Sequence, residues 1–187
     1  MEIKVAKTAG FCFGVRRAVD LTYGLLAEGR QVATLGPLIH NPQAVEDMQK
    51  KGALVADSLA DVPAGYEVVI RSHGVPRSVY DELAERKIAY HDATCPFVQK
   101  IQRIAAEAEK AGAVLLVAGD KTHPEVQGIV GHTRGEVFVF ADLAELKAWK
   151  GPSDPQKPLF AVAQTTFQVT KWQESSEFLK KAYTNAR

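Results

Sequence analysis

The sequence predicts an α/β protein made of two tandem, pseudo-repeated α/β units, each with a parallel sheet. The first observation behind this prediction is an internal repeat, in which five pairs of residues share one offset of 83 positions. The pairs are Cys12 and Cys95, Gly29 and Gly112, Gly36 and Gly119, His40 and His123, and Gly52 and Gly135. The second observation is that short apolar runs alternate with amphipathic stretches, as in parallel sheets covered by helices.

Six short apolar runs have the length and composition of buried strands. They are residues 3–6, 32–35, 68–70, 114–117, 137–140 and 159–163. With the repeat, these runs place the first unit at residues 1–94 and the second at residues 95–187.

Helices are predicted between several of these strands. Residues 14–28 and 96–111 carry apolar side chains at helical spacing, and each stretch is followed by a glycine, Gly29 or Gly112. Glycine commonly ends helices because it adopts a positive φ at little cost. Asn41-Pro42 combines a capping residue with a favoured first helical residue, so a third helix is expected from there to Gly52.

A linker-like stretch at residues 151–158 has no counterpart in the first copy and raises the repeat offset to 93. At that offset Arg71-Ser72-His73 aligns with Gln164-Thr165-Thr166. Cys95 aligns with the position after Arg187, so the repeat predicts a third unit that opens with a third cysteine and a chain that is truncated. The stretch itself suits either a hinge or a surface loop.

Composition excludes several classes of protein. The 187 residues are 46% hydrophobic and 24% charged, as in ordinary globular proteins, and the net charge of +1 indicates no basic nucleic-acid face. The N-terminus lacks the apolar region of a secretory signal, and the longest apolar run, at residues 113–118, is too short to span a bilayer. We expect a cytoplasmic protein, in which cysteines are more often thiols, metal ligands or catalysts than disulfides.

Cys12 and Cys95 both lie where a predicted strand gives way to a helix. Cys95 precedes Pro96 and therefore takes the capping position, for which cysteine is a poor choice. The positive end of a helix stabilises a thiolate, the form that binds iron or attacks an electrophile. The alternative is that both cysteines fill the core as small hydrophobes. Their shared register favours a functional role.

Three of the five histidines, His40, His73 and His123, follow predicted strands. Ligands of α/β sheets bind at this edge, where a histidine donor suits an anion such as phosphate. The alternative is three ordinary surface histidines. His91 and His132 lack this placement, and we interpret them as structural.

Glu125 begins a predicted helix, where it could relay protons or only complement the helix dipole. Thr165 and Thr166 offer hydroxyl groups at a strand end, although such threonines often only cap helices. The sequence has no Walker A motif and no Gly-x-Gly-x-x-Gly, so no motif indicates nucleotide binding.

Six segments together resemble the 4-hydroxy-3-methylbut-2-enyl diphosphate reductase family, the iron–sulfur reductases of the non-mevalonate isoprenoid pathway. The segments are Ala9-Gly10-Phe11-Cys12-Phe13-Gly14-Val15, Gly36-Pro37-Leu38-Ile39-His40-Asn41-Pro42, Arg71-Ser72-His73-Gly74-Val75, Asp92-Ala93-Thr94-Cys95-Pro96, His123-Pro124-Glu125-Val126 and Gln164-Thr165-Thr166. They are spread along the whole chain.

The resemblance implies a trefoil of three α/β units around a 4Fe-4S cluster with one open iron. It implies removal of a hydroxyl group from an allylic diphosphate, with ferredoxin or flavodoxin as the electron donor. By matching motif positions, the cluster ligands would be Cys12 and Cys95, and the diphosphate ligands would be His40, His73 and His123. Glu125 would supply protons, and Thr165 or Thr166 would orient the hydroxyl group.

The chain departs from the family because the third cysteine and the third unit are absent. We expect the face that this unit would cover to promote self-association. Three other functions stay open: a cluster-free diphosphate-binding module, a homodimer that bridges one cluster, and a zinc hydrolase.

Overall fold

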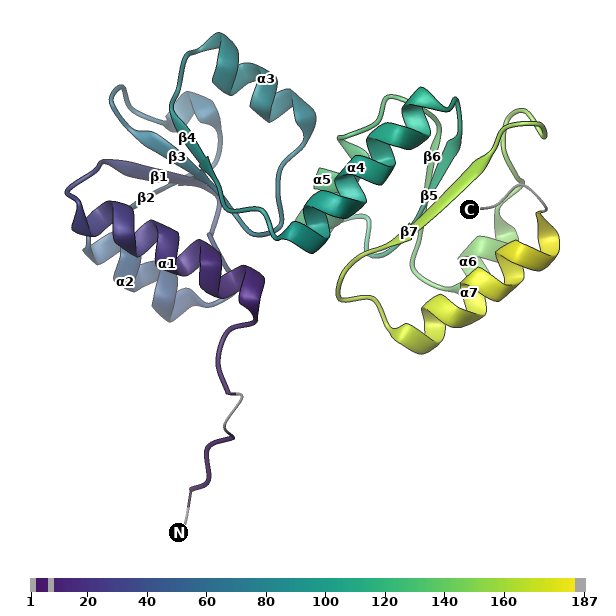
Figure 1. The fold of residues 1–187 in the computed structure, drawn as a ribbon, viewed down its shortest axis with the longest axis horizontal. Coiled ribbons are helices and arrows are strands. Elements are labelled where there is room, and N and C mark those ends of the chain that lie inside the picture. The colour runs from purple at the N-terminus through teal and green to yellow at the C-terminus, as the bar shows by residue number, and fades with distance from the viewer. Residues whose placement is uncertain (1–2, 7–8, 184–187) are drawn as a thin grey trace. The chain divides into compact units, whose positions relative to one another are not determined.

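A computed structural model of the chain describes residues 3–6 and 9–183 (Figure 1). The chain separates into two compact units. The first comprises the residues up to Ser72 together with Ile88–Cys95, and the second comprises His73–Lys87 and the residues from Pro96 onward.

The first unit is built on a four-stranded sheet, sheet A, in which all strands are parallel and the order is β2-β1-β3-β4. Its elements are α1 (Phe13–Ala27), β1 (Val32–Leu35), α2 (Pro42–Lys50), β2 (Leu54–Ala56), the short 3-10 helix η1 (Leu59–Asp61), β3 (Glu67–Ile70) and β4 (Tyr90–Asp92). Strand β4 forms one edge of sheet A.

Helices α1 and α2 pack together on sheet A (Figure 1). Ala18 of α1 and Met48 of α2 join Val32 and Val69 of the sheet in one buried cluster. Burial of apolar surface of this kind stabilises a fold by about 25 cal/mol per Å².

The second unit contains a three-stranded parallel sheet, sheet B, with the order β6-β5-β7. Its elements are α3 (Arg77–Glu85), α4 (Pro96–Lys110), β5 (Val114–Ala118), α5 (Pro124–Val130), β6 (Val137–Phe140), α6 (Leu143–Ala148), β7 (Leu159–Ala163) and α7 (Val169–Ala182).

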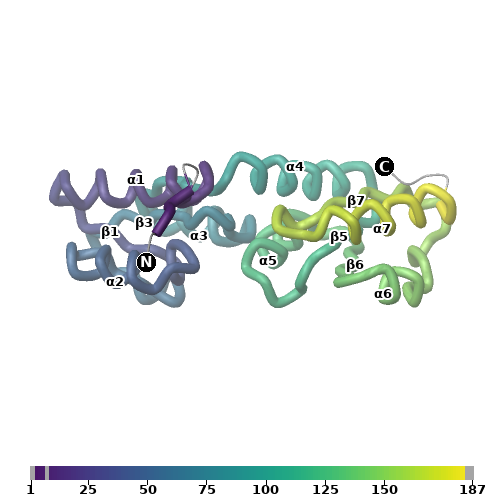
Figure 2. The backbone as a smooth tube through the Cα atoms, turned by 90° about the horizontal axis from the view of Figure 1, so that it is seen from below, coloured from purple at the N-terminus to yellow at the C-terminus, as the bar shows by residue number. Residues whose placement is uncertain are grey.

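Every residue of the central strand β5 is buried because helices cover both faces of sheet B. Leu115 and Val117 pack toward α4 and α5, whereas Leu116 packs toward α6 and α7. Figure 2 shows α4 on one side of β5 and α6 on the other. This two-sided burial explains why β5 is an unbroken apolar run rather than an alternating one.

The predicted α/β class with repeated parallel units is confirmed. In each sheet the first strand is central, with the second strand on one side and the third on the other, giving β2-β1-β3 and β6-β5-β7. The helix before each central strand is followed by a glycine with positive φ, +76° at Gly29 and +62° at Gly112. The repeat in sequence is therefore a repeat in topology.

One predicted strand is wrong, and two observed strands were not predicted. Residues 3–6 form no strand, and Ile3 and Val5 are 75% and 78% exposed. An isolated apolar run cannot form a strand unless a neighbour satisfies its backbone groups, and no pairing to residues 3–6 occurs in the described part of the chain. Strands β2 and β4 were not predicted, because each has only three residues and is partly exposed.

Residues 151–158 connect α6 to β7 inside the second unit, so the structure favours the surface loop over the hinge. The Glu136 carboxylate anchors this loop: it accepts hydrogen bonds from the Ser153 backbone N–H at 3.0 Å and the Lys157 ammonium group at 3.1 Å. Over the described residues, every helix is too short or too polar to cross a bilayer.

Candidate functional site

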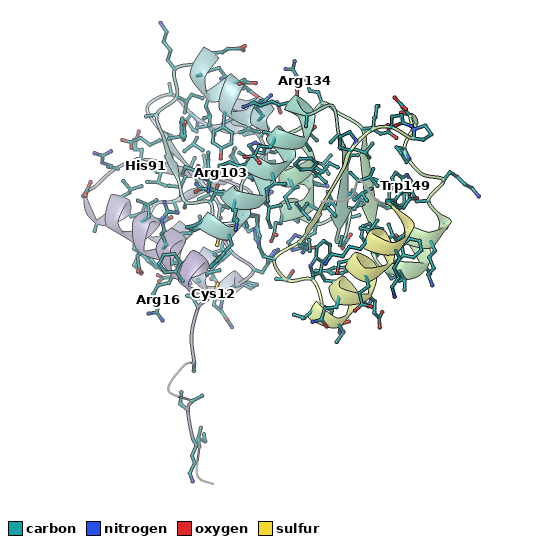
Figure 3. The ribbon with its side chains drawn as sticks, turned by 45° about the vertical axis from the view of Figure 1, so that its right-hand side comes forward. Cys12, Arg16, His91, Arg103, Arg134 and Trp149 are labelled. Atoms are coloured by element: carbon teal, nitrogen blue, oxygen red, sulfur yellow. The ribbon has the colours of Figure 1, made fainter. Side chains whose placement is uncertain are left out.

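Each cysteine lies directly before a helix, as predicted, and both belong to the first unit. Cys12 is the N-cap residue of α1 and is exposed, and Cys95 immediately precedes α4 and is half-buried. Both are free thiols. Figure 3 labels Cys12 at the N-terminal end of α1.

The Cys95 thiol lies against the first turn of α1. A Cβ atom built on Gly14 would lie 2.7 Å from Cys95 Sγ and 2.9 Å from Cys95 Cβ. Glycine is therefore required at position 14 by the approach of Cys95, so the Cys95 thiol lies at the helix N-terminus that Cys12 caps.

Thr94, the residue before Cys95, is fully buried. Within the described part of the chain, its hydroxyl group has no hydrogen-bond partner. A buried hydroxyl group without a partner costs free energy, and an acceptor bound beside Cys95 would supply one. Thiolates are also the ligands that iron–sulfur clusters use. The two thiols and the buried hydroxyl group therefore fit the chemistry of an iron–sulfur cluster.

Two of the three predicted site histidines, His73 and His123, lie together in the second unit. Their ring centroids are 5.4 Å apart, and their planes are nearly perpendicular, at 81°. His123 caps α5, and its Nδ1 atom accepts a hydrogen bond from the Glu125 backbone N–H at 3.1 Å. A neutral ring with Nδ1 as acceptor carries its proton on Nε2.

Gly128 of α5 and Gly131, the residue that caps its C-terminus, bring His73 to this place. A Cβ atom on Gly131 would lie 2.4 Å from Pro76 Cβ, and one on Gly128 would lie 3.4 Å from the His73 carbonyl oxygen. The loop that carries His73 therefore packs directly on the backbone of α5. The role of these two glycines in placing His73 was not predicted from the sequence, where their spacing is the signal for it.

Glu125 is 2% exposed, and both of its carboxylate oxygens are occupied by one residue. The Thr165 backbone N–H donates to Oε1 at 2.6 Å, and the Thr165 hydroxyl group donates to Oε2 at 2.8 Å. These bonds join the start of α5 to the end of β7. They form a contact between a carboxylate and a hydroxyl group through which a proton can pass.

Gln164, which the sequence analysis did not single out as a site residue, connects the ends of β5 and β7. Its Oε1 atom accepts from the Asp120 backbone N–H at 3.2 Å, and its Nε2 atom donates to the Thr166 hydroxyl group at 3.0 Å. Gly119 allows this approach, because a Cβ atom there would lie 2.9 Å from Oε1. Hydrogen bonds from Thr122 hold the pKa of Asp120 below its usual value.

A shallow cavity of ≈ 230 Å³ opens beside Gln164 and Thr166. A larger one of ≈ 410 Å³ lies farther along the same edge of sheet B, lined by Phe138 and Trp149, and includes none of the predicted site residues. The smaller cavity is the one that adjoins a predicted site residue, Thr166.

The remaining histidines are His40, His91 and His132. His40 lies in the first unit, is exposed, and directly precedes Asn41, which caps α2. His91 contacts the Glu67 carboxylate at 2.6 Å, and His132 Nε2 lies 3.0 Å from the Val75 carbonyl oxygen. His91 thus contacts a side chain of β3, and His132 contacts a backbone carbonyl group.

The fold and these groups define a class of protein: a repeated parallel α/β protein with two thiols at one helix start and an imidazole, carboxylate and hydroxyl group at the edge of its second sheet. A family model described as "LytB protein" matches residues 3–187. The chain belongs to the LytB family.

Curated relatives carry the name 4-hydroxy-3-methylbut-2-enyl diphosphate reductase. The relative from Syntrophotalea carbinolica is 42% identical over 178 residues, which cover 95% of this chain and 62% of the relative. The relative from Clostridioides difficile is 39% identical over 167 residues, covering 89% of this chain and 59% of the relative. This chain therefore spans about three-fifths of the length of these relatives.

Solved structures of reductases also match the fold of this chain. The structure of an (E)-4-hydroxy-3-methyl-but-2-enyl diphosphate reductase matches 99% of this chain and 66% of its own with a TM-score of 0.82 and 33% identity. The corresponding reductase of Plasmodium falciparum matches 97% of this chain and 57% of its own with a TM-score of 0.86. Its identity is 24%, so this second likeness concerns the fold alone.

Proposed function

We propose that this chain acts in the reductive removal of the hydroxyl group from 4-hydroxy-3-methylbut-2-enyl diphosphate, giving isopentenyl and dimethylallyl diphosphates. Membership of the LytB family and the name of its curated relatives support this proposal. Because the chain spans 62% of such a relative, we propose that it supplies part of the site.

The proposed reaction breaks one C–O bond and forms one C–H bond. It consumes two electrons and two protons, of which one proton joins the leaving oxygen to give water and the other joins carbon. The electrons come from an external donor of the ferredoxin or flavodoxin kind. The chain must therefore bind an anion, orient a hydroxyl group and deliver protons.

Cys12 and Cys95 would hold the 4Fe-4S cluster, which when bound supplies a Lewis acid for the hydroxyl group and a path for electrons. Support comes from the contact of Cys95 with Gly14 at the start of α1 and from the unpaired Thr94 hydroxyl group. Ligands beyond these two thiolates would come from outside this chain, because it has two cysteines.

The diphosphate would be bound by His40, His73 and His123. His123 is suited to this role because the hydrogen bond from the Glu125 backbone N–H to Nδ1 fixes the neutral ring as the tautomer that donates through Nε2. A donor fixed in this way binds phosphate oxygen without reorganisation.

The hydrogen bonds between Glu125 and Thr165 are the observation that carries the proposal. A protonated Glu125 would pass its proton to the Thr165 hydroxyl oxygen, while the Thr165 hydroxyl proton moves on to the leaving hydroxyl group of the substrate. Such a relay needs a donor that is also an acceptor, and a hydroxyl group is both. Burial of Glu125 keeps bulk water from replacing this route.

The test is Glu125→Gln, compared with Glu145→Gln. Glu145 occupies the first turn of α6 as Glu125 does that of α5, and it accepts from the Ala141 backbone N–H. The chains are reconstituted anaerobically with iron and sulfide, and turnover is measured with a reduced viologen dye. We expect Glu125→Gln to lower turnover by about 10²- to 10⁴-fold at unchanged iron content and pyrophosphate affinity, and Glu145→Gln to match wild type.

Wild-type turnover in Glu125→Gln would contradict the proton route. Near-zero iron in the wild-type chain with intact pyrophosphate binding would favour the cluster-free diphosphate module instead. Iron at half a cluster per chain would favour the bridged homodimer.

A further inference from the structure

The segment that carries Cys95 continues strand β4 along the open edge of sheet A. The Ala93 backbone N–H donates to the Ile70 carbonyl oxygen at 3.0 Å, and the Cys95 backbone N–H donates to the Ser72 carbonyl oxygen at 2.9 Å. Ala93 and Cys95 thus pair with the β3 side. In an extended strand the residues that alternate with them point their backbone groups the other way, so Asp92 and Thr94 face the unpaired edge.

Arg17 of α1 occupies that edge. Its Nη1 atom donates to the Thr94 carbonyl oxygen and its Nη2 atom to the Asp92 carbonyl oxygen, both at 3.0 Å. The Thr94 backbone N–H is satisfied by the Asp92 side chain at 2.9 Å. One planar guanidinium group thus holds two carbonyl groups at once, which the single ammonium group of lysine does with poorer geometry.

Through these hydrogen bonds, helix α1 links Cys12 to the segment that carries Cys95. Cys12 caps α1, and Arg17 is five residues further along the same helix. Gly14, between them, forms the surface against which the Cys95 sulfur lies. The segment before Cys95 is therefore held by β3 on one side and by Arg17 on the other.

We propose that Arg17 is a positioning residue that fixes the Cys95 thiol relative to the Cys12 thiol, so that the two-thiol site is formed before any metal binds. The expected effect of Arg17 on the cluster rests on the proposed function, whereas its effect on the spacing of the two thiols does not. The spacing of the two thiols can be measured without a cluster.

The first experiment uses the metal-free chain under reducing, anaerobic conditions. Phenylarsine oxide captures two neighbouring thiols by forming two As–S bonds with release of water. Its affinity is compared among wild type, Arg17→Gln, Arg17→Lys and Arg16→Gln. Arg16 is the matched control because it is an exposed arginine of the same helix and points outward (Figure 3).

We expect Arg17→Gln to weaken arsenical capture by about 10- to 100-fold, the range typical of losing a residue that orients a metal ligand. Arg17→Lys should recover part of this loss because it keeps the charge and one hydrogen bond. Arg16→Gln should match wild type. Reaction of the thiols with a monofunctional maleimide should not slow in any variant, because each single thiol stays accessible.

The second experiment follows the reconstituted cluster. Arg17→Gln should release iron to a chelator about 10-fold faster than wild type and should change the electron paramagnetic resonance signal and the reduction potential of the cluster. A purely structural role would lower the melting temperature but leave the signal and the potential of the remaining folded protein unchanged.

Wild-type arsenical affinity in Arg17→Gln, or no recovery in a folded Arg17→Lys, would overturn the proposal. If Arg17→Gln does not fold, Arg17→Lys against Arg16→Gln decides. If the wild-type chain captures the arsenical but no iron, the proposed cluster function fails and the arsenical comparison alone decides the role of Arg17.

Discussion

At the scale of single residues, Thr165 and Thr166 are neighbours in sequence with different partners. The Thr165 hydroxyl group donates to Glu125, whereas the Thr166 hydroxyl group accepts from Gln164. The sequence alone does not distinguish the two hydroxyl groups, whereas their hydrogen-bond partners do. Only Thr165 has the carboxylate contact that a proton relay requires.

We therefore expect Thr165→Val to lower turnover of the reconstituted chain by about 10²-fold, because the hydroxyl group of the relay is lost. Thr166→Val should cost much less, since Gln164 keeps its bond to Asp120. Turnover and the iron content of both variants are measured side by side. Equal losses in the two variants would remove Thr165 from the proposed route.

At the scale of elements, Glu67 joins three segments of the first unit at the start of β3. Its carboxylate contacts His91 of β4 and Arg30 of the connection between α1 and β1. Hydrogen bonds from His91 and Arg30 lower the pKa of Glu67 from its usual value of 4.5. The Glu67 side chain is 23% exposed, so solvent partly screens these interactions and their contribution to stability is modest.

A lowered carboxyl pKa fixes the sign of the pH dependence. Glu67 stabilises the folded state above its ordinary pKa, and this contribution is lost as the pH falls through the lower folded-state value. Between pH about 7 and about 3, the urea midpoint should fall more for wild type than for Glu67→Gln. Glu46→Gln, which alters a simple surface pair with Lys50, is the control and should follow wild type. A Glu67→Gln midpoint with the wild-type pH dependence would contradict this assignment.

At the scale of the whole molecule, the two units have separate buried clusters. The first is built from α1, α2 and sheet A, and the second and third cover the two faces of sheet B. Both cysteines belong to the first unit. A ligand stabilises the part of a protein that binds it, so cluster binding should act on the first unit.

Hydrogen exchange of the reconstituted chain before and after chelation measures this directly. Removal of the cluster should raise exchange in α1 and β4 and leave the amides of β5 unchanged. In the Cys12→Ser, Cys95→Ser double variant, chelation should have no effect. A uniform change over both sheets would show that the units do not respond separately.

The sequence by itself determined the features that depend on local backbone preferences and on the repeat. The α/β class, the central strands β1 and β5, and the cysteines before α1 and α4 were all predicted, because apolar periodicity and helix-ending glycines act over a few residues. The roles proposed for His40, His73, His123 and Glu125 came from motif positions and stay predictions.

Only the tertiary structure decided which distant groups meet. Thr165 bonds Glu125 across 40 positions, and Arg17 reaches Thr94 across 77. Residues 3–6 show the converse, since their apolar run has no strand beside it and stays exposed. A hydrogen bond or a ladder needs a partner in space, and local sequence encodes the preference of a segment but not the neighbour that satisfies it.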